Sequence, residues 1–231
     1  MIPLLPALIA GAVALFVVAN VVIAARRVAD TAGYWQRRIN EPVGPDDFRL
    51  VALGDSSVQA IGADRPMDGY VGRIARYVAA KTGRHVHITN VSTGGTAADM
   101  VRDQLPEVDL ASADLVIVAD SNDMQHRVPL DRYSAELACL VDALPAERTV
   151  FSDLPLWPGR KAYQAVLERA TDSRGLRRAD FEAVFRGQRR LDIFSWLPPH
   201  LNNKGYAYWA EAFRPQVDSV LAHQVVDSKT R

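Results

Sequence analysis

Short apolar runs alternate with amphipathic segments along most of the chain, and this alternation restricts the fold more than any other feature. Each apolar run is only three to six residues long, which is typical of a strand buried on both faces. Apolar residues recur at helical spacing in the segments between the runs. The runs are residues 49–53, 86–91, 115–119 and 149–151, and the helical segments are residues 68–81, 97–105, 130–144, 162–185 and 204–221. The pattern predicts an α/β domain, with a central parallel sheet covered by helices on both sides.

Composition narrows the class of protein. The 231 residues, of which 48% are hydrophobic, can bury one core, and 27 basic residues balance 27 acidic ones, so no nucleic-acid partner is expected. The single cysteine excludes a disulfide framework, and the helical spacing around Cys139 predicts a buried thiol. The five histidines show no ligand spacing with cysteine or acidic residues, so no metal is expected. No dinucleotide fingerprint or phosphate-binding loop occurs, and no cofactor is predicted.

The N-terminal segment differs from the rest, because residues 2–25 contain no charged side chain. At about 1.5 Å per residue, a helix of this length covers the roughly 30 Å of a bilayer core, which predicts a transmembrane anchor. A cleaved secretory signal is the alternative, although no basic residue precedes the apolar run. The flanking arginines Arg26, Arg27, Arg37 and Arg38 favour a cytoplasmic position for the domain that follows, and the opposite side stays open.

Four parts of the chain are therefore expected. Residues 2–25 form the anchor, and residues 26–47 form a juxtamembrane helix and a proline-containing linker. Residues 48–222 form the α/β domain, and residues 223–231 form a flexible tail.

Polar residues follow three of the predicted strands. The segments are Gly54-Asp-Ser-Ser57, Ser92-Thr-Gly-Gly-Thr96 and Asp120-Ser-Asn-Asp123, and His200 precedes the last predicted helix. Ligands of an open parallel sheet bind beyond the carboxyl ends of its strands. We therefore expect these segments to meet in one site.

In this order, the segments resemble the SGNH (GDSL-type) hydrolases, over residues 49 to about 222. The resemblance implies a three-layer flavodoxin-like fold and a serine esterase. It implies that Ser56 is the nucleophile and His200 the base. The backbone N–H groups of Ser56 and Gly94 and the side-chain amide of Asn122 would form the oxyanion hole. The chemistry agrees, because a serine hydroxyl needs a nearby base to become a nucleophile. The α/β-hydrolase pattern Gly-x-Ser-x-Gly is absent.

Each of these residues also has a structural interpretation. Ser56 can cap a helix, Gly94 can serve a turn, Asn122 can satisfy a loop backbone and His200 can be an ordinary loop residue.

Two positions depart from the family pattern. The family has an aspartate three residues before the histidine, and this chain has Leu197 there. Either Asp192, Asp123 or a backbone carbonyl orients His200, or the enzyme is impaired. Asp120 stands where the family usually has glycine, and we expect it to face solvent or a cation.

The predicted substrate is an ester, a thioester, a lysophospholipid or an acetylated sugar, and Trp157, Trp196 and Leu197 are candidates for an apolar acyl pocket. The first alternative is a catalytically impaired, membrane-tethered protein that binds an acyl or glycan ligand. The second is an interaction domain with a flavodoxin-like fold and no activity.

Overall fold

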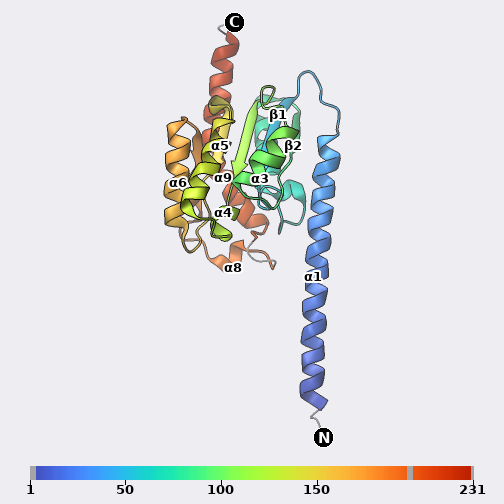
Figure 1. Cartoon of the computed structure of the whole chain (residues 1–231). Coiled ribbons are helices and arrows are strands. Elements are labelled where there is room, and N and C mark those ends of the chain that lie inside the picture. Colours follow the sequence, from blue (N-terminus) through green and yellow to red (C-terminus); the bar gives the residue numbers. More distant parts are fainter. Residues whose placement is uncertain (1–3, 197–199, 230–231) are drawn as a thin grey trace.

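A computed structural model describes residues 4–196 and 200–229 of the chain (Figure 1). Its centre is a five-stranded parallel sheet with the strand order β2-β1-β3-β4-β5. The strands are β1 (Phe48–Gly54), β2 (Val86–Asn90), β3 (Leu115–Ala119), β4 (Thr149–Ser152) and β5 (Arg177–Ala179). The predicted α/β class and parallel sheet are confirmed.

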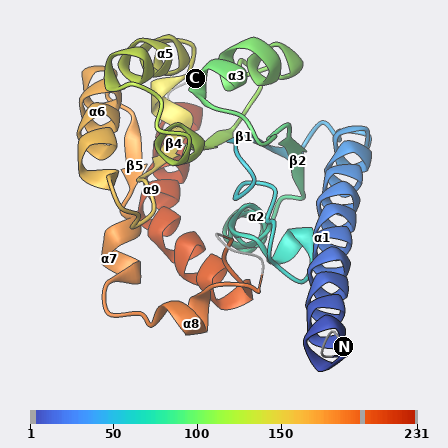
Figure 2. The same cartoon turned by 60° about the horizontal axis from the view of Figure 1, so that its bottom comes forward.

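Helices cover both faces of the sheet, as Figure 2 shows. One face carries α2 (Tyr70–Thr82), α7 (Phe181–Phe185) and α9 (Asn203–Lys229), and the other carries α3 (Ala97–Asp99), α5 (Leu130–Asp142) and α6 (Arg160–Ser173). Alternate side chains of β1 supply the two cores, since Leu50 packs with the first group and Val51 with the second. This double burial explains why the strands read as continuous apolar runs.

Short helical turns complete the connections. They are η1 (Pro66–Asp68), the π-helix η2 (Met100–Gln104), η3 (Leu105–Glu107), α4 (Asn122–Gln125), η4 (Ala146–Arg148) and α8 (Arg190–Ile193).

Two local expectations were wrong. The predicted helical segment 162–185 contains strand β5, which lies at the sheet edge and carries two arginines instead of an apolar run. Cys139 is exposed, because Tyr133, Leu137 and Leu140 form the buried face of α5 and leave the thiol on the outer face.

Helix α1 (Leu4–Ile39) packs on the domain only near its C-terminal end, and its N-terminal part extends away in Figure 1. The indole of Trp35 is buried there, and its N–H donates to the carbonyl of Gln59 at 3.0 Å. Over residues 4–196 and 200–229, no helix has both the length and the apolar character that crossing a bilayer requires. The anchor predicted for residues 2–25, which begins outside the described residues, and the orientation that depended on it are therefore not supported.

Candidate active site

The site lies where the strand order reverses. Ser56 follows β1 and Asn122 follows β3, and these two strands are neighbours in the sheet. In sheets with the order 2-1-3-4-5, ligands bind outside the carboxyl ends of the strands at this switch point. The topology therefore brings two of the predicted segments to one edge.

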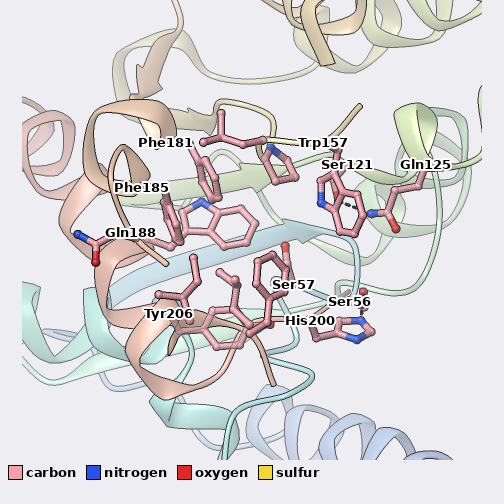
Figure 3. A pocket seen from close by; sticks show the side chains of 16 residues that line it. Ser56, Ser57, Ser121, Gln125, Trp157, Phe181, Phe185, Gln188, His200 and Tyr206 are labelled. Atoms are coloured by element: carbon pink, nitrogen blue, oxygen red, sulfur yellow. Dashed lines mark hydrogen bonds between the residues drawn. The ribbon is translucent and has the colours of Figure 1, made fainter. Parts of the chain in front are cut away.

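Ser56 and His200 meet at this edge, as Figure 3 shows. The distance from Ser56 Oγ to His200 Nε2 is 2.9 Å, although the two residues are 144 positions apart in the sequence. Both side chains are half-buried. In the tautomer that carries its proton on Nδ1, Nε2 accepts the hydroxyl hydrogen, which is the arrangement that a general base requires.

Backbone hydrogen bonds position the turn that carries His200. Phe194 and Leu201 form an antiparallel bridge across the turn, and Ser195 N–H donates to the carbonyl of His200 at 2.9 Å. Residues 197–199 of this turn, and with them Leu197, lie outside the described residues.

Asn202 joins this turn to the start of α9. Its amide nitrogen donates to the carbonyls of Asp192 and Phe194, at 3.0 and 3.1 Å. Its side-chain oxygen accepts from the N–H groups of Lys204 and Gly205, at 2.9 and 3.0 Å. Asn202 therefore caps α9 and fixes the turn of the base at the same time.

Gly62 lets the segment after Ser56 approach the His200 turn. Its φ is +96°, and a Cβ at this position would lie 2.5 Å from Leu201 O and 2.8 Å from His200 Cβ. Only glycine fits both the conformation and the contact. This close approach is the physical reason for a glycine six residues after Ser56.

Gln104 holds the start of the serine turn. Its side-chain oxygen accepts from Gly54 N–H at 2.8 Å, and its amide nitrogen donates to Gly54 O at 2.9 Å. Gln104 is buried at the end of the π-helix η2. This role of Gln104 could not be predicted from the sequence, since a single glutamine in an amphipathic segment gives no signal.

Asp55 joins the turn after β1 to the turn after β3. One carboxylate oxygen accepts from Ser57 N–H at 2.8 Å. The other accepts from Ser121 N–H at 2.9 Å and from the Ser121 hydroxyl. Asp55 is fully buried. Asp55 is part of the predicted Gly54-Asp-Ser-Ser57 segment, but its role was not predicted. Its position directly after an apolar strand was the available signal.

Asn122 lies beside the loop that contains Gly94. Its side-chain nitrogen donates to the carbonyls of Gly94 and Gly95, at 2.5 and 3.1 Å. The group of Gly94 that faces Asn122 is thus its carbonyl oxygen.

The two carboxylates near Asn122 are buried together. Asp120 is 2% exposed, so the expectation that it faces solvent or a cation was wrong. Burial, and next the charge of Asp123, raise the pKa of Asp120 well above its usual range. Burial also raises the pKa of Asp123, whose Oδ2 accepts from Ala97 N–H at 2.7 Å.

The two acidic candidates for orienting His200 have other contacts in the described part of the chain. Asp123 is directed toward Ala97 and Asp120. Asp192 is exposed on α8, and its carbonyl accepts from Asn202. Among the described residues there is no group of three or more side chains that could hold a metal ion.

A cavity of about 140 Å³ opens beside Ser56 and His200. Its lining is mainly aromatic and aliphatic, and Asp, Glu, Lys and Arg are absent from the part of it that the structure describes: Ser56, Ser57, Ser121, Gln125, Pro155, Leu156, Trp157, Phe181, Phe185, Gln188, Ile193, Phe194, His200, Leu201, Tyr206 and Trp209. Figure 3 shows Phe181 and Phe185 at the end away from Ser56 and His200. Trp157 lines the cavity as predicted. Trp196 is not among these residues, is 47% exposed and lies under the Arg27 guanidinium.

Several solved structures share the fold of this chain, and two of the three described next are named as esterases. The psychrotrophic esterase EstA from Pseudoalteromonas sp., in a structure inhibited by monoethylphosphonate, is 16% identical with a TM-score of 0.61, covering 76% of this chain and 100% of that one. TesA is 20% identical with a TM-score of 0.63, and the match covers 74% of this chain and 99% of TesA. Axe2, an acetylxylan esterase from Geobacillus stearothermophilus, is 18% identical with a TM-score of 0.60, and the match covers 73% of this chain and 93% of Axe2. At these identities, the likeness shows the fold.

Family membership comes from the sequence itself. No curated protein matches the chain significantly. The GDSL-like lipase/acylhydrolase family matches residues 52–208, which is more than half of the chain and includes Ser56, Asn122 and His200. The resemblance to SGNH hydrolases is thereby confirmed. The chain belongs to the GDSL-like lipase/acylhydrolase family and is a hydrolase enzyme.

Proposed function

We propose that this hydrolase is a serine esterase that acts through an acyl-enzyme on Ser56. The observation that carries the proposal is the 2.9 Å distance between Ser56 Oγ and His200 Nε2, at the mouth of an apolar cavity. A helix-capping role for Ser56 would require no histidine at this distance.

The reaction has two stages. Ser56 Oγ attacks the ester carbonyl carbon, and its proton moves to His200 Nε2. The bond to the alkoxy group then breaks, and His200 returns the proton to the leaving alkoxide. In the second stage, His200 takes a proton from water, which attacks the acyl-enzyme and releases the acid. His200 then returns that proton to Ser56 Oγ.

The oxyanion that forms in each stage needs hydrogen-bond donors. In this proposal, the donors are the N–H groups of Ser56 and Gly94 and the side-chain amide of Asn122. Loss of one such donor typically lowers turnover about 10²- to 10³-fold. The position of Asn122 beside the Gly94 loop supports this assignment.

Labelling with a fluorophosphonate probe tests the proposal. We expect covalent modification of Ser56 and hydrolysis of p-nitrophenyl esters, both abolished in Ser56→Ala. We expect His200→Ala to lower kcat by about 10²- to 10⁴-fold, because the general base is lost.

Ser134→Ala is the matched control, since Ser134 is exposed on α5 away from the cavity. This variant should react with the fluorophosphonate probe and hydrolyse p-nitrophenyl esters as the unaltered chain does. If the folded, unaltered chain neither labels nor hydrolyses any p-nitrophenyl ester, the esterase proposal is wrong. An acyl-binding protein without turnover would then fit the cavity better.

The cavity favours an ester or thioester with an uncharged, apolar acyl group. None of the described lining residues is an Asp, Glu, Lys or Arg, and a buried ionic group on the substrate would need a partner. Its volume of about 140 Å³ is comparable with the roughly 150 Å³ apolar cavity that binds benzene in an engineered protein. We therefore infer an acyl group of about six carbon atoms.

A series of p-nitrophenyl esters tests this inference. We expect kcat/KM for the hexanoate to exceed that for the acetate about tenfold, and to fall again for the dodecanoate. Phe185→Ala should move the optimum to longer acyl chains, because the Phe185 ring lines the cavity. This ring stacks on that of Phe181, with 4.0 Å between the ring centroids. Phe16→Ala, which alters an exposed residue of α1, should leave the ratios unchanged. Equal rates across the series would exclude this cavity as the acyl site.

A further inference from the structure

The side-chain amide of Asn122 is fully occupied. An amide NH₂ group has two hydrogens to donate. The nitrogen of Asn122 already donates to two acceptors, Gly94 O at 2.5 Å and Gly95 O at 3.1 Å. No hydrogen remains for an oxyanion in this arrangement. The loop must change before Asn122 can stabilise a transition state.

The loop is held at both ends. On one side, Thr93 N–H donates to Gly54 O at 3.0 Å. On the other, Thr96 forms a capping box with Asp99, whose carboxylate accepts from Thr96 N–H and from its hydroxyl, at 2.8 and 2.9 Å. Between these fixed points lie the two glycines. A local rotation is therefore available, whereas displacement of the whole loop would break both attachments.

We propose that the Gly94–Gly95 peptide unit rotates when substrate binds, which turns Gly94 O away from Asn122 and presents Gly95 N–H to the oxyanion. The inference rests on the proposed esterase function and adds Gly95 as a catalytic residue. The carbonyl and the N–H of one trans peptide unit point in opposite directions, so a half-turn exchanges an acceptor for a donor. The rotation also frees one hydrogen of Asn122.

The second bond of Asn122 keeps the amide oriented during this change. Gly95 O belongs to the next peptide unit, so rotation of the Gly94–Gly95 unit does not remove it. Asn122 is 8% exposed, which limits alternative positions of its side chain.

The two glycines differ in the space around them. The space around Gly94 is open, since a Cβ there would meet no atom within 4 Å. Gly95 is tight, since a Cβ there would lie 2.4 Å from Asp99 Cβ. The rotation also changes ψ of Gly94 and φ of Gly95 by roughly half a turn, and glycine populates both signs of φ.

Charge on the substrate supplies the driving force. A carbonyl oxygen directed into the hole repels a developing oxyanion, and an N–H group attracts it. A ligand shifts an equilibrium only as far as it binds the two states differently. The negative oxygen of the substrate therefore favours the orientation in which Gly95 N–H faces it over the one in which Gly94 O faces it.

Crystal structures of the free protein and of a phosphonate adduct test the inference. The probe is p-nitrophenyl ethyl hexylphosphonate. Ser56 Oγ bonds to phosphorus, p-nitrophenolate leaves, and the hydroxyl proton passes to His200. We expect the phosphoryl oxygen about 3 Å from Gly95 N and Asn122 Nδ2, a normal hydrogen-bond distance. Gly94 O should face away, and the free protein should retain its bond to Asn122.

The outcomes separate the two proposals. An adduct in which Gly94 O still accepts from Asn122 overturns the rotation and leaves the esterase proposal intact. If no p-nitrophenolate is released, the esterase proposal fails, and the rotation fails with it.

Nuclear magnetic resonance gives a second measurement in solution. In protein labelled with ¹⁵N-asparagine, the Asn122 amide signals are assigned by their loss in Asn122→Gln. We expect them to shift on phosphonylation, while the exposed Asn40 amide, bonded to Gln36 O at 2.7 Å, keeps its position. Unchanged Asn122 signals in a fully phosphonylated sample would contradict the rotation.

Discussion

Asp120 shows how a single residue can depart from its family and still suit the site. An ionised carboxylate beside Asn122 would oppose an oxyanion electrostatically. Burial raises the pKa of Asp120 instead, and the neighbouring Asp123 reinforces the effect. A carboxyl group with a raised pKa stays neutral to higher pH, so the pair carries less negative charge than two free aspartates would. Sequence alone does not show this, because pairing of the two carboxyl groups depends on the turn after β3.

The raised pKa predicts how Asp120→Asn changes stability with pH. The proton bound by Asp120 stabilises the fold fully below the unfolded-state pKa of about 3.8, and this contribution is lost as pH rises through the higher folded-state pKa. Asparagine is neutral at every pH in this range, so it does not titrate. We expect the free energy of unfolding of Asp120→Asn, relative to the unaltered chain, to increase as pH rises above 3.8.

Urea unfolding at a series of pH values measures the difference. Asp131→Asn serves as the control, since Asp131 is exposed on α5. A difference that is independent of pH would mean that Asp120 is ionised in the folded protein.

At the scale of elements, what the sequence could predict depended on burial. Strand β3 was predicted with its observed bounds, and β1 within one residue, because their apolar runs are unambiguous. Strand β5 was missed, since an edge strand of Arg-Arg-Ala has no apolar signal. The same limit applies to the site. The segments containing Ser56, Asn122 and His200 could be identified from sequence, whereas the contacts of Gln104 and the orientation of Gly94 O depend on tertiary packing.

Gly62 links two elements that the sequence separates widely, and Gly62→Ala tests that link. The methyl group would press on His200 Cβ and Leu201 O, so the base should move relative to Ser56. A misplacement of about 1 Å can lower turnover about 10²-fold, and we expect kcat to fall by about that factor.

Gly83→Ala is the matched control, because Gly83 has a φ of +70° and open space around its Cβ position. Both variants should lose about 1–2 kcal/mol of stability from the left-handed conformation. Equal kcat values for the two would show that the Gly62 contact does not position His200.

At the scale of the whole molecule, helix α1 joins the domain through its C-terminal part. Trp35 is 3% exposed within the core, whereas Leu15, Phe16 and Val18 are exposed. The family match begins at residue 52 and therefore does not include this contact.

Truncation separates the two parts of α1. A chain that starts at residue 26 should keep its urea midpoint and esterase activity, because it retains Trp35. In a chain that starts at residue 40, the free energy of unfolding should fall by about 3–5 kcal/mol, the usual effect of removing a buried tryptophan side chain. Trp35→Ala in the full chain should reproduce that loss. Equal stability of the two truncated chains would mean that Trp35 is not part of the folding core.

The carboxylate of Asp55 has a consequence for motion. It bonds to Ser57 and Ser121 together, so the turn that carries the nucleophile and the turn that carries the amide donor share one buried attachment. Local opening of one turn would strip the other of its partner, and regions coupled in this way open as a cooperative unit. Thermal fluctuations should therefore disassemble the catalytic centre all at once, and partly formed sites with a nucleophile but no amide donor should be rare.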